Sequence, residues 1–263
     1  MKPRTLLYDE KGRGEPIVLV PGGLTGWLSW IPHQERLADD YRVIRIQPVH
    51  NELGSAGRIP EAGYDHDVER DSVAKTLDEL GIETPHLAGW SGGARSLINF
   101  AVAYPERVRT LTLIEPPAFW AGEEAGLDDE QFRRIRAFSA RVAGRSVSEE
   151  DLAEFLTLAG FASSPEDVKA GPNWERWLPH RQTLAADHMV GNPPLHLSDL
   201  ERVDRPVLLV KGTVSTEWLR RIVDVLGQRF PQATVLELPG THACHIESID
   251  AFLEAFRKHV TSG

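Results

Sequence analysis

Short runs of valine, isoleucine and leucine recur along this sequence and alternate with longer segments of helical period. Runs of this kind predict strands that are buried on both faces, and they fall at residues 17–20, 42–46, 86–88, 111–114, 207–210 and 234–238. Residues 5–9 and the turn after them predict an edge strand ahead of the first buried one. Buried strands separated by helices are typical of a parallel sheet with helices on both sides.

Four segments between or after these strands have a clear helical pattern, at residues 67–80, 91–104, 217–229 and 248–259. In the last of them Ile249, Phe252, Leu253 and Phe256 are spaced so that they share one helix face. The alternation therefore predicts a mostly parallel central sheet with flanking helices.

The alternation of strands and helices stops between residues 119 and 200, where no convincing strand is found. Helical patterns occur there at residues 128–142, 149–159, 166–170 and 174–186. A helical insertion between two strands of a parallel sheet predicts a cap over the carboxyl ends of the strands, where such sheets bind ligands. We therefore expect a core domain of residues 1–118 and 201–263 and a helical cap of residues 119–200.

Charge and cysteine content narrow the classes of partner. The net charge of −10 disfavours nucleic acid and anionic membranes as partners. Cys244 is the only cysteine, which excludes an intramolecular disulfide and a metal site built from several cysteines.

The histidines show no ligand spacing, so no metal or cofactor is expected. The first residues lack a signal-peptide pattern, no apolar run could span a bilayer, and a cytoplasmic location is expected. The sequence leaves the oligomeric state open.

The strongest chemical motif is Gly89-Trp90-Ser91-Gly92-Gly93, between a predicted strand and a predicted helix. This is the setting of a nucleophile elbow, a sharp turn that exposes a reactive serine and needs small neighbours. The backbone N–H of Gly92 would then lie at a helix N-terminus, where a developing oxyanion is stabilised.

A second glycine motif, Pro21-Gly22-Gly23, follows the first buried strand. A loop at this position supplies the second oxyanion N–H in folds with a nucleophile elbow. We expect Gly23 to be that donor, because a residue without a side chain lets a ligand approach the backbone.

With these motifs in place the chain resembles the α/β-hydrolase superfamily over residues 16–259. The resemblance implies the α/β-hydrolase fold and a triad in the chain order serine, acid, histidine. Ser91 would be the nucleophile. His242 would be the general base, because its Gly-Thr-His setting directly after the last strand resembles the family pattern. His245 is a nearby competitor.

The position of the triad acid departs from the pattern that is most common in the superfamily. Most relatives carry an aspartate just after the next-to-last strand, and here that position is Ser215. A second acid position in the superfamily lies at the end of the strand after the nucleophile helix, and there the sequence has Glu115. We expect Glu115 to be the acid, with Glu217 as the rival.

The motifs look most like those of fungal zearalenone lactone hydrolases, which share a Val-Pro-x-Gly-Leu loop (residues 20–24), a glutamate acid and Leu-Pro-Gly-x-His (residues 238–242). The resemblance implies a cofactor-free serine hydrolase acting on a small-molecule carboxylic ester or lactone through an acyl-enzyme on Ser91. Carbon–carbon bond hydrolases, hydroxynitrile-lyase-like enzymes and small-molecule receptors with a slow triad keep the same serine and stay open as alternatives.

Three tryptophans are candidates for the substrate pocket. Trp90 belongs to the elbow itself, and Trp174 and Trp177 are three residues apart in the predicted cap. That spacing puts the cap pair on one helix face. They would line an apolar pocket or, as the alternative, form the core of the cap.

Overall fold

The computed structural model describes residues 1–61, 63–186 and 195–263. A seven-stranded sheet runs through it in the order β1-β3-β2-β4-β5-β6-β7, with β1 antiparallel to β3 and the other pairs parallel. The strands are β1 (Leu7–Lys11), β2 (Pro16–Val20), β3 (Arg42–Gln47), β4 (His86–Trp90), β5 (Thr110–Ile114), β6 (Val207–Gly212) and β7 (Ala233–Leu238).

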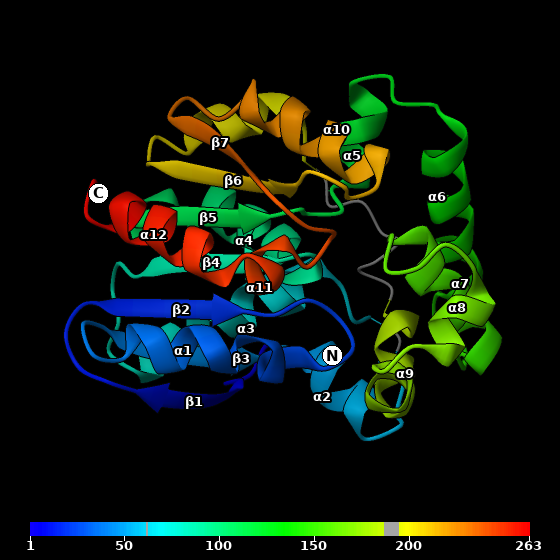
Figure 1. Cartoon of the computed structure of the whole chain (residues 1–263). Coiled ribbons are helices and arrows are strands. Elements are labelled where there is room, and N and C mark those ends of the chain that lie inside the picture. The colour runs from blue at the N-terminus through cyan, green and yellow to red at the C-terminus, as the bar shows by residue number, and fades with distance from the viewer. Residues whose placement is uncertain (62, 187–194) are drawn as a thin grey trace.

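Helices connect the strands and cover the sheet (Figure 1). The described α-helices are α1 (Ile31–Leu37), α2 (Val49–Ser55), α3 (His66–Glu79), α4 (Gly92–Ala103), α5 (Phe119–Glu124), α6 (Glu130–Val142), α7 (Glu149–Leu158), α8 (Pro165–Ala170), α9 (Trp174–Trp177), α10 (Glu217–Gly227), α11 (Cys244–Glu247) and α12 (Ile249–Val260). The described 3₁₀ helices are η1 (Gly26–Trp30), η2 (Pro105–Arg107), η3 (Leu178–Ala185) and η5 (Leu197–Arg202).

Successive residues of each central strand pack on opposite faces of the sheet, as strand geometry requires. On β2, Val18 and Val20 join one apolar cluster, while Ile17 and Leu19 join the other. Helices α3 and α4 cover the first face, and α1 and α12 cover the second (Figure 1). The near-continuous apolar runs in the sequence therefore reflect strands with a core on each side.

The segment between β5 and β6 holds helices and, in its described residues 119–186 and 195–200, no strand. Helices α6 to α9 lie beyond the carboxyl ends of the parallel strands, where the sequence places a cap (Figure 1). Helix α5 differs, because Phe119 packs on Trp218 of α10 with ring centroids 5.6 Å apart. The beginning of the predicted cap is thus attached to the sheet side of the molecule.

Three predicted elements differ in detail from the structure. Strand β7 was expected to be buried on both faces, but it lies at the edge of the sheet and only Leu238 among its residues is buried. Residues 174–186 do not form one α-helix, because α9 ends at Trp177 and the chain continues as η3. Pro179 lies at the start of η3, where its missing N–H and its ring disfavour continuation of the preceding helix. The edge strand is Leu7–Lys11 instead of residues 5–9. Among the helices that the structure describes, none combines the length and apolar composition of a membrane span.

Candidate active site

Ser91 occupies a strained turn between β4 and α4. Its backbone has φ 53° and ψ −122°, and residues with a side chain rarely adopt a positive φ. A Cβ on Gly89 would lie 2.7 Å from the backbone of Ala94, and one on Gly93 would lie 2.4 Å from the carbonyl oxygen of Pro21. The two glycines therefore permit the close approach of strand, turn and helix that a nucleophile elbow needs.

The loop after β2 lies against this elbow. A Cβ on Gly22 would be 3.1 Å from the Cβ of Ser91. Asn51 donates a hydrogen bond from Nδ2 to the carbonyl oxygen of Gly22 at 3.0 Å. The backbone N–H of Leu24 donates to Oγ1 of Thr183 at 3.0 Å. These contacts hold the loop in place beside the nucleophile.

The two predicted oxyanion donors, Gly23 and Gly92, line the same cavity as Ser91. Gly92 is the first residue of α4, and the first N–H groups of a helix have no partner within the helix. The positive end of the helix dipole also favours negative charge there. The position of both residues is compatible with an oxyanion hole, and their role stays a prediction.

Glu115 follows β5 directly and is completely buried. Its Oε2 accepts hydrogen bonds from Nδ1 of His242 and from the hydroxyl of Ser215, both at 2.7 Å. Its Oε1 accepts the backbone N–H of Gly212 at 2.8 Å. Ser215, at the position where the sequence pattern led us to look for an aspartate, is thus a hydrogen-bond donor to Glu115.

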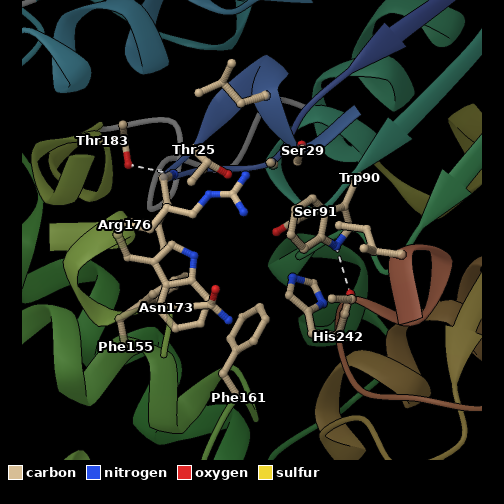
Figure 2. A pocket seen from close by; sticks show the side chains of 18 of the residues that line it. Thr25, Ser29, Trp90, Ser91, Phe155, Phe161, Asn173, Arg176, Thr183 and His242 are labelled. Atoms are coloured by element: carbon tan, nitrogen blue, oxygen red, sulfur yellow. Dashed lines mark hydrogen bonds between the residues drawn. The ribbon is translucent and has the colours of Figure 1, made fainter. Parts of the chain in front are cut away.

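His242 and Ser91 line one cavity and lie near each other in Figure 2. A carboxylate is acceptor-only, so the proton between Glu115 and His242 belongs to Nδ1 of the imidazole. This leaves Nε2 as the nitrogen that can accept a proton from Ser91. The indole N–H of Trp90 donates to the carbonyl oxygen of His242 at 2.8 Å, which holds the histidine loop against the elbow (Figure 2).

The other candidates for the acid and the base, Glu217 and His245, are not part of the Glu115–His242 pair. Glu217 is exposed in the first turn of α10. His245 is fully buried, and burial together with the neighbouring His33 and His242 holds its pKa well below the ordinary value. Burial, with the negative charge of Glu115, raises the pKa of the Cys244 thiol, so this cysteine is an unreactive core residue.

The cavity has a volume of about 410 Å³ and lies between the elbow and the cap. Trp90 and Trp177 line it, and Trp177 packs on Phe161 with ring centroids 5.3 Å apart. Trp174 does not belong to its lining. It is buried in the cap with the ammonium group of Lys169 over its ring at 5.9 Å. The prediction that both cap tryptophans line the pocket therefore fails for Trp174, which belongs to the core of the cap.

Several cavity residues were not foreseen from the sequence. They are polar or charged side chains from loops and short helices, namely Thr25, Ser29, His50, Asn173, Arg176 and Thr183. Thr25 and His50 had a usable signal, because each comes shortly after a predicted strand, at the sheet edge where ligands bind. In the ranges that the structure describes, no cluster of histidine, cysteine and carboxylate side chains could hold a metal ion.

The chain belongs to the family described as the alpha/beta hydrolase fold, whose model matches residues 15–248. Among curated proteins, the 2-hydroxymuconate semialdehyde hydrolase of a Pseudomonas species is 37% identical over 188 residues. The match covers 66% of this chain and 65% of that protein, so slightly less than two thirds of the relative is spanned.

Solved structures show the same fold. An esterase from Thermogutta terrifontis matches with a TM-score of 0.75 at 22% identity, over 98% of this chain and 93% of the other. A meta-cleavage product hydrolase from Pseudomonas fluorescens matches with a TM-score of 0.68 at 19% identity, over 97% and 93%. The predicted fold class is confirmed. These relatives include meta-cleavage product hydrolases and an esterase, and the closer resemblance to zearalenone lactone hydrolases is not shown.

Proposed function

We propose that this protein is a serine hydrolase that cleaves a carboxylic ester or lactone through an acyl-enzyme on Ser91. The observation that carries the proposal is the buried Glu115–His242 pair, joined at 2.7 Å, whose His242 lines the same cavity as the strained Ser91. A nucleophile, a base and a group that orients the base are the parts that acyl transfer requires.

In this mechanism Oγ of Ser91 attacks the substrate carbonyl carbon while its proton passes to Nε2 of His242. Glu115 stabilises the resulting imidazolium. The N–H groups of Gly23 and Gly92 stabilise the oxyanion, and return of the proton to the leaving oxygen releases the alcohol. A water molecule then attacks the acyl-enzyme with His242 again as base, which frees the acid and restores Ser91.

The test is labelling with a fluorophosphonate followed by mass spectrometry. We expect one adduct, on Ser91, and expect Ser91→Ala to lose both the adduct and ester hydrolysis while it stays folded. Ser29→Ala is the matched control, because Ser29 lines the same cavity and its hydroxyl is committed to the carbonyl oxygen of Gly26 at 2.7 Å. An adduct on another serine, or an active Ser91→Ala variant, would overturn the proposal.

A carbon–carbon bond hydrolase is the second candidate, and Arg176 is the observation that favours it. This exposed residue of the cap lines the cavity, and within the described ranges its guanidinium group has no ion-pair partner. Arginine binds carboxylates well, and a carboxylate is present in the dienoates after which one relative from Comamonas testosteroni is named.

The two candidates are separated by comparing kcat/KM for p-nitrophenyl esters with kcat/KM for 2-hydroxy-6-oxo-6-phenylhexa-2,4-dienoate. The first proposal expects the ester to be the better substrate. A dienoate preferred by more than tenfold, with that preference lost in Arg176→Gln, would establish the second candidate instead.

A further inference from the structure

The peptide group between Gly22 and Gly23 carries the N–H that we expect to stabilise the oxyanion. Neither residue has a side chain, so the backbone around this peptide has weak conformational preferences of its own. A donor contributes to catalysis only if it already points to the place where negative charge develops. The direction of the Gly23 N–H must therefore be set by contacts that the loop makes with other parts of the molecule.

Asn51 makes such a contact. Its Nδ2 donates a hydrogen bond to the carbonyl oxygen of Gly22 at 3.0 Å. Because a trans peptide is planar, its C=O and N–H groups point in opposite directions. Asn51 is completely buried and lies outside the cavity lining, whereas Gly22 and Gly23 belong to that lining. The bond thus turns the C=O of this peptide into the protein, and it turns the N–H of Gly23 toward the cavity on the opposite side.

The peptide group on the other side of Gly23 is held as well. Its N–H, which belongs to Leu24, donates to Oγ1 of Thr183 in η3 at 3.0 Å and is not available to a ligand. In the part of the chain that the structure describes, the N–H of Gly23 has no protein acceptor. Of these two N–H groups, that of Gly23 is therefore the one that can bind an oxyanion.

Helix α2 holds Asn51 in place. The carboxylate of Glu69 in α3 accepts the backbone N–H groups of Val49 and His50 at 3.3 and 3.2 Å, which satisfies two donors at the start of α2. Further along α2, a Cβ on Gly54 would lie 2.3 Å from a side-chain atom of η3, so the helix packs closely on that segment. Asn51 thus belongs to a helix that is held from two sides.

We propose that Asn51 is a positioning residue, which aims the N–H of Gly23 at the substrate oxygen by holding the C=O of Gly22. It acts through this peptide group and does not touch the substrate. The proposal rests on the proposed serine-hydrolase function, because the aimed N–H stabilises the oxyanion that forms when Ser91 attacks. Without the hydrogen bond the peptide is free to rotate, and the oxyanion loses one of its two donors.

The test is Asn51→Leu, which keeps the size of the side chain and removes the donor. Removal of one oxyanion donor lowers kcat by about 10²- to 10³-fold. A peptide that is free to rotate still samples the aimed orientation, so we expect kcat on a p-nitrophenyl ester to fall by at least about tenfold. KM should stay within about threefold, because the donor acts mainly in the transition state. Asn51→Ala, which also lacks the donor, takes its place if Asn51→Leu does not fold.

Gln34→Leu is the matched control. Gln34 is also buried, and its amide donates to the carbonyl oxygen of Val43 at 3.2 Å, outside the cavity lining. Both variants lose a buried hydrogen bond to a carbonyl oxygen and should have a lower melting temperature than the wild type. Only Asn51→Leu should lose kcat. A purely stabilising role of Asn51 predicts instead that both variants keep kcat when it is measured well below their melting temperatures.

An aryl trifluoromethyl ketone gives a second readout. Oγ of Ser91 adds to its carbonyl carbon, the serine proton passes to His242, and the ketone oxygen becomes an oxyanion like that of the transition state. The inhibition constant should rise in Asn51→Leu by the same factor by which kcat/KM falls. An unchanged inhibition constant would show that Asn51 does not act on the oxyanion.

Crystal structures of the wild type and of Asn51→Leu separate this proposal from the proposed function. We expect the peptide between Gly22 and Gly23 to change its orientation in the variant. If the wild type neither cleaves an ester nor takes the fluorophosphonate label, the hydrolase function fails, and a rotated peptide still supports the positioning role of Asn51. A folded variant with the kcat of the wild type, or a peptide that keeps its orientation, overturns that role.

Discussion

Glu115→Gln replaces the carboxylate that binds His242 with an amide of the same shape. The amide oxygen can keep the hydrogen bond from the N–H of Gly212, and this orientation turns the amide NH₂ toward His242 and Ser215. The imidazole must then accept at Nδ1 and carry its proton on Nε2. That nitrogen is the one that has to take the proton of Ser91, so the variant holds the base in the wrong tautomer.

The size of the effect follows from this tautomer change. The equivalent exchange of aspartate for asparagine in the serine-protease triad lowers turnover about 10⁴-fold. We expect Glu115→Gln to lower kcat by at least about 10²-fold, which corresponds to about 2.7 kcal/mol. A loss of this size is expected when an interaction made in the transition state, such as the charge that stabilises the imidazolium, is removed.

The assay measures kcat on a chromogenic ester and the melting temperature on the same samples, because Glu115 is buried and unfolding has to be excluded. Glu217→Gln is the control for the same chemical exchange at an exposed site, and Ser215→Ala removes one donor while it keeps the charge. Each should change kcat by less than about tenfold. A folded, nearly fully active Glu115→Gln together with an inactive Glu217→Gln would refute the assignment of the acid.

Two further predictions concern stability. Burial, opposed by a hydrogen bond to the carbonyl oxygen of His245, lowers the pKa of His33 from 6.5 to about 4, so the unfolded chain takes up the proton first as pH falls. The contribution of neutral His33 to the free energy of unfolding is fully present above about pH 6.5 and is lost as the pH falls toward 4. About 2 kcal/mol of it is lost by pH 5. Urea unfolding should show this loss in the wild type and a flatter profile in His33→Gln, and identical profiles would contradict it. Gly93→Ala should lower the melting temperature and abolish fluorophosphonate labelling, because its Cβ would lie 2.4 Å from the carbonyl oxygen of Pro21. Gly23→Ala, with 3.6 Å to the nearest atom, should melt like the wild type, and equal melting of both variants would contradict the steric argument.

The sheet was predictable because its signal is local. A strand such as β5 or β6 is apolar on both faces, and this pattern is readable without knowledge of its neighbours. Helices α1 and α2 were not predicted, since each has only seven residues and includes polar residues that are buried by tertiary contacts. For the same reason the continuation of α9 into η3 was not foreseen.

The site residues that could be predicted are likewise those with a local signal in the sequence, and those missed depend on tertiary contacts. Ser91 lies in a glycine motif whose spacing reflects a backbone requirement. Glu115 comes directly after β5, and His242 lies in the loop that follows β7. The pair formed by His50 and Glu69 joins residues 19 positions apart on different helices, and no local pattern indicates that α3 presents its carboxylate to α2. The exclusion of Trp174 from the cavity likewise depends on how the short α9 packs in the cap.

The contact between Ser215 and Glu115 has a consequence for how such a triad could change during evolution. The hydroxyl at the end of one strand and the carboxylate at the end of the adjacent strand meet within 2.7 Å, beside the same imidazole nitrogen. An aspartate at position 215 would therefore bring a carboxylate to nearly the same point in space as Glu115. For a short time the chain would carry two acids that share one proton, because like charges this close disfavour double ionisation. Either acid could then be lost by a single substitution. The residue that carries the carboxylate could thus change by 100 positions in the sequence, from 115 to 215, while the placement of a carboxylate beside the imidazole stayed the same.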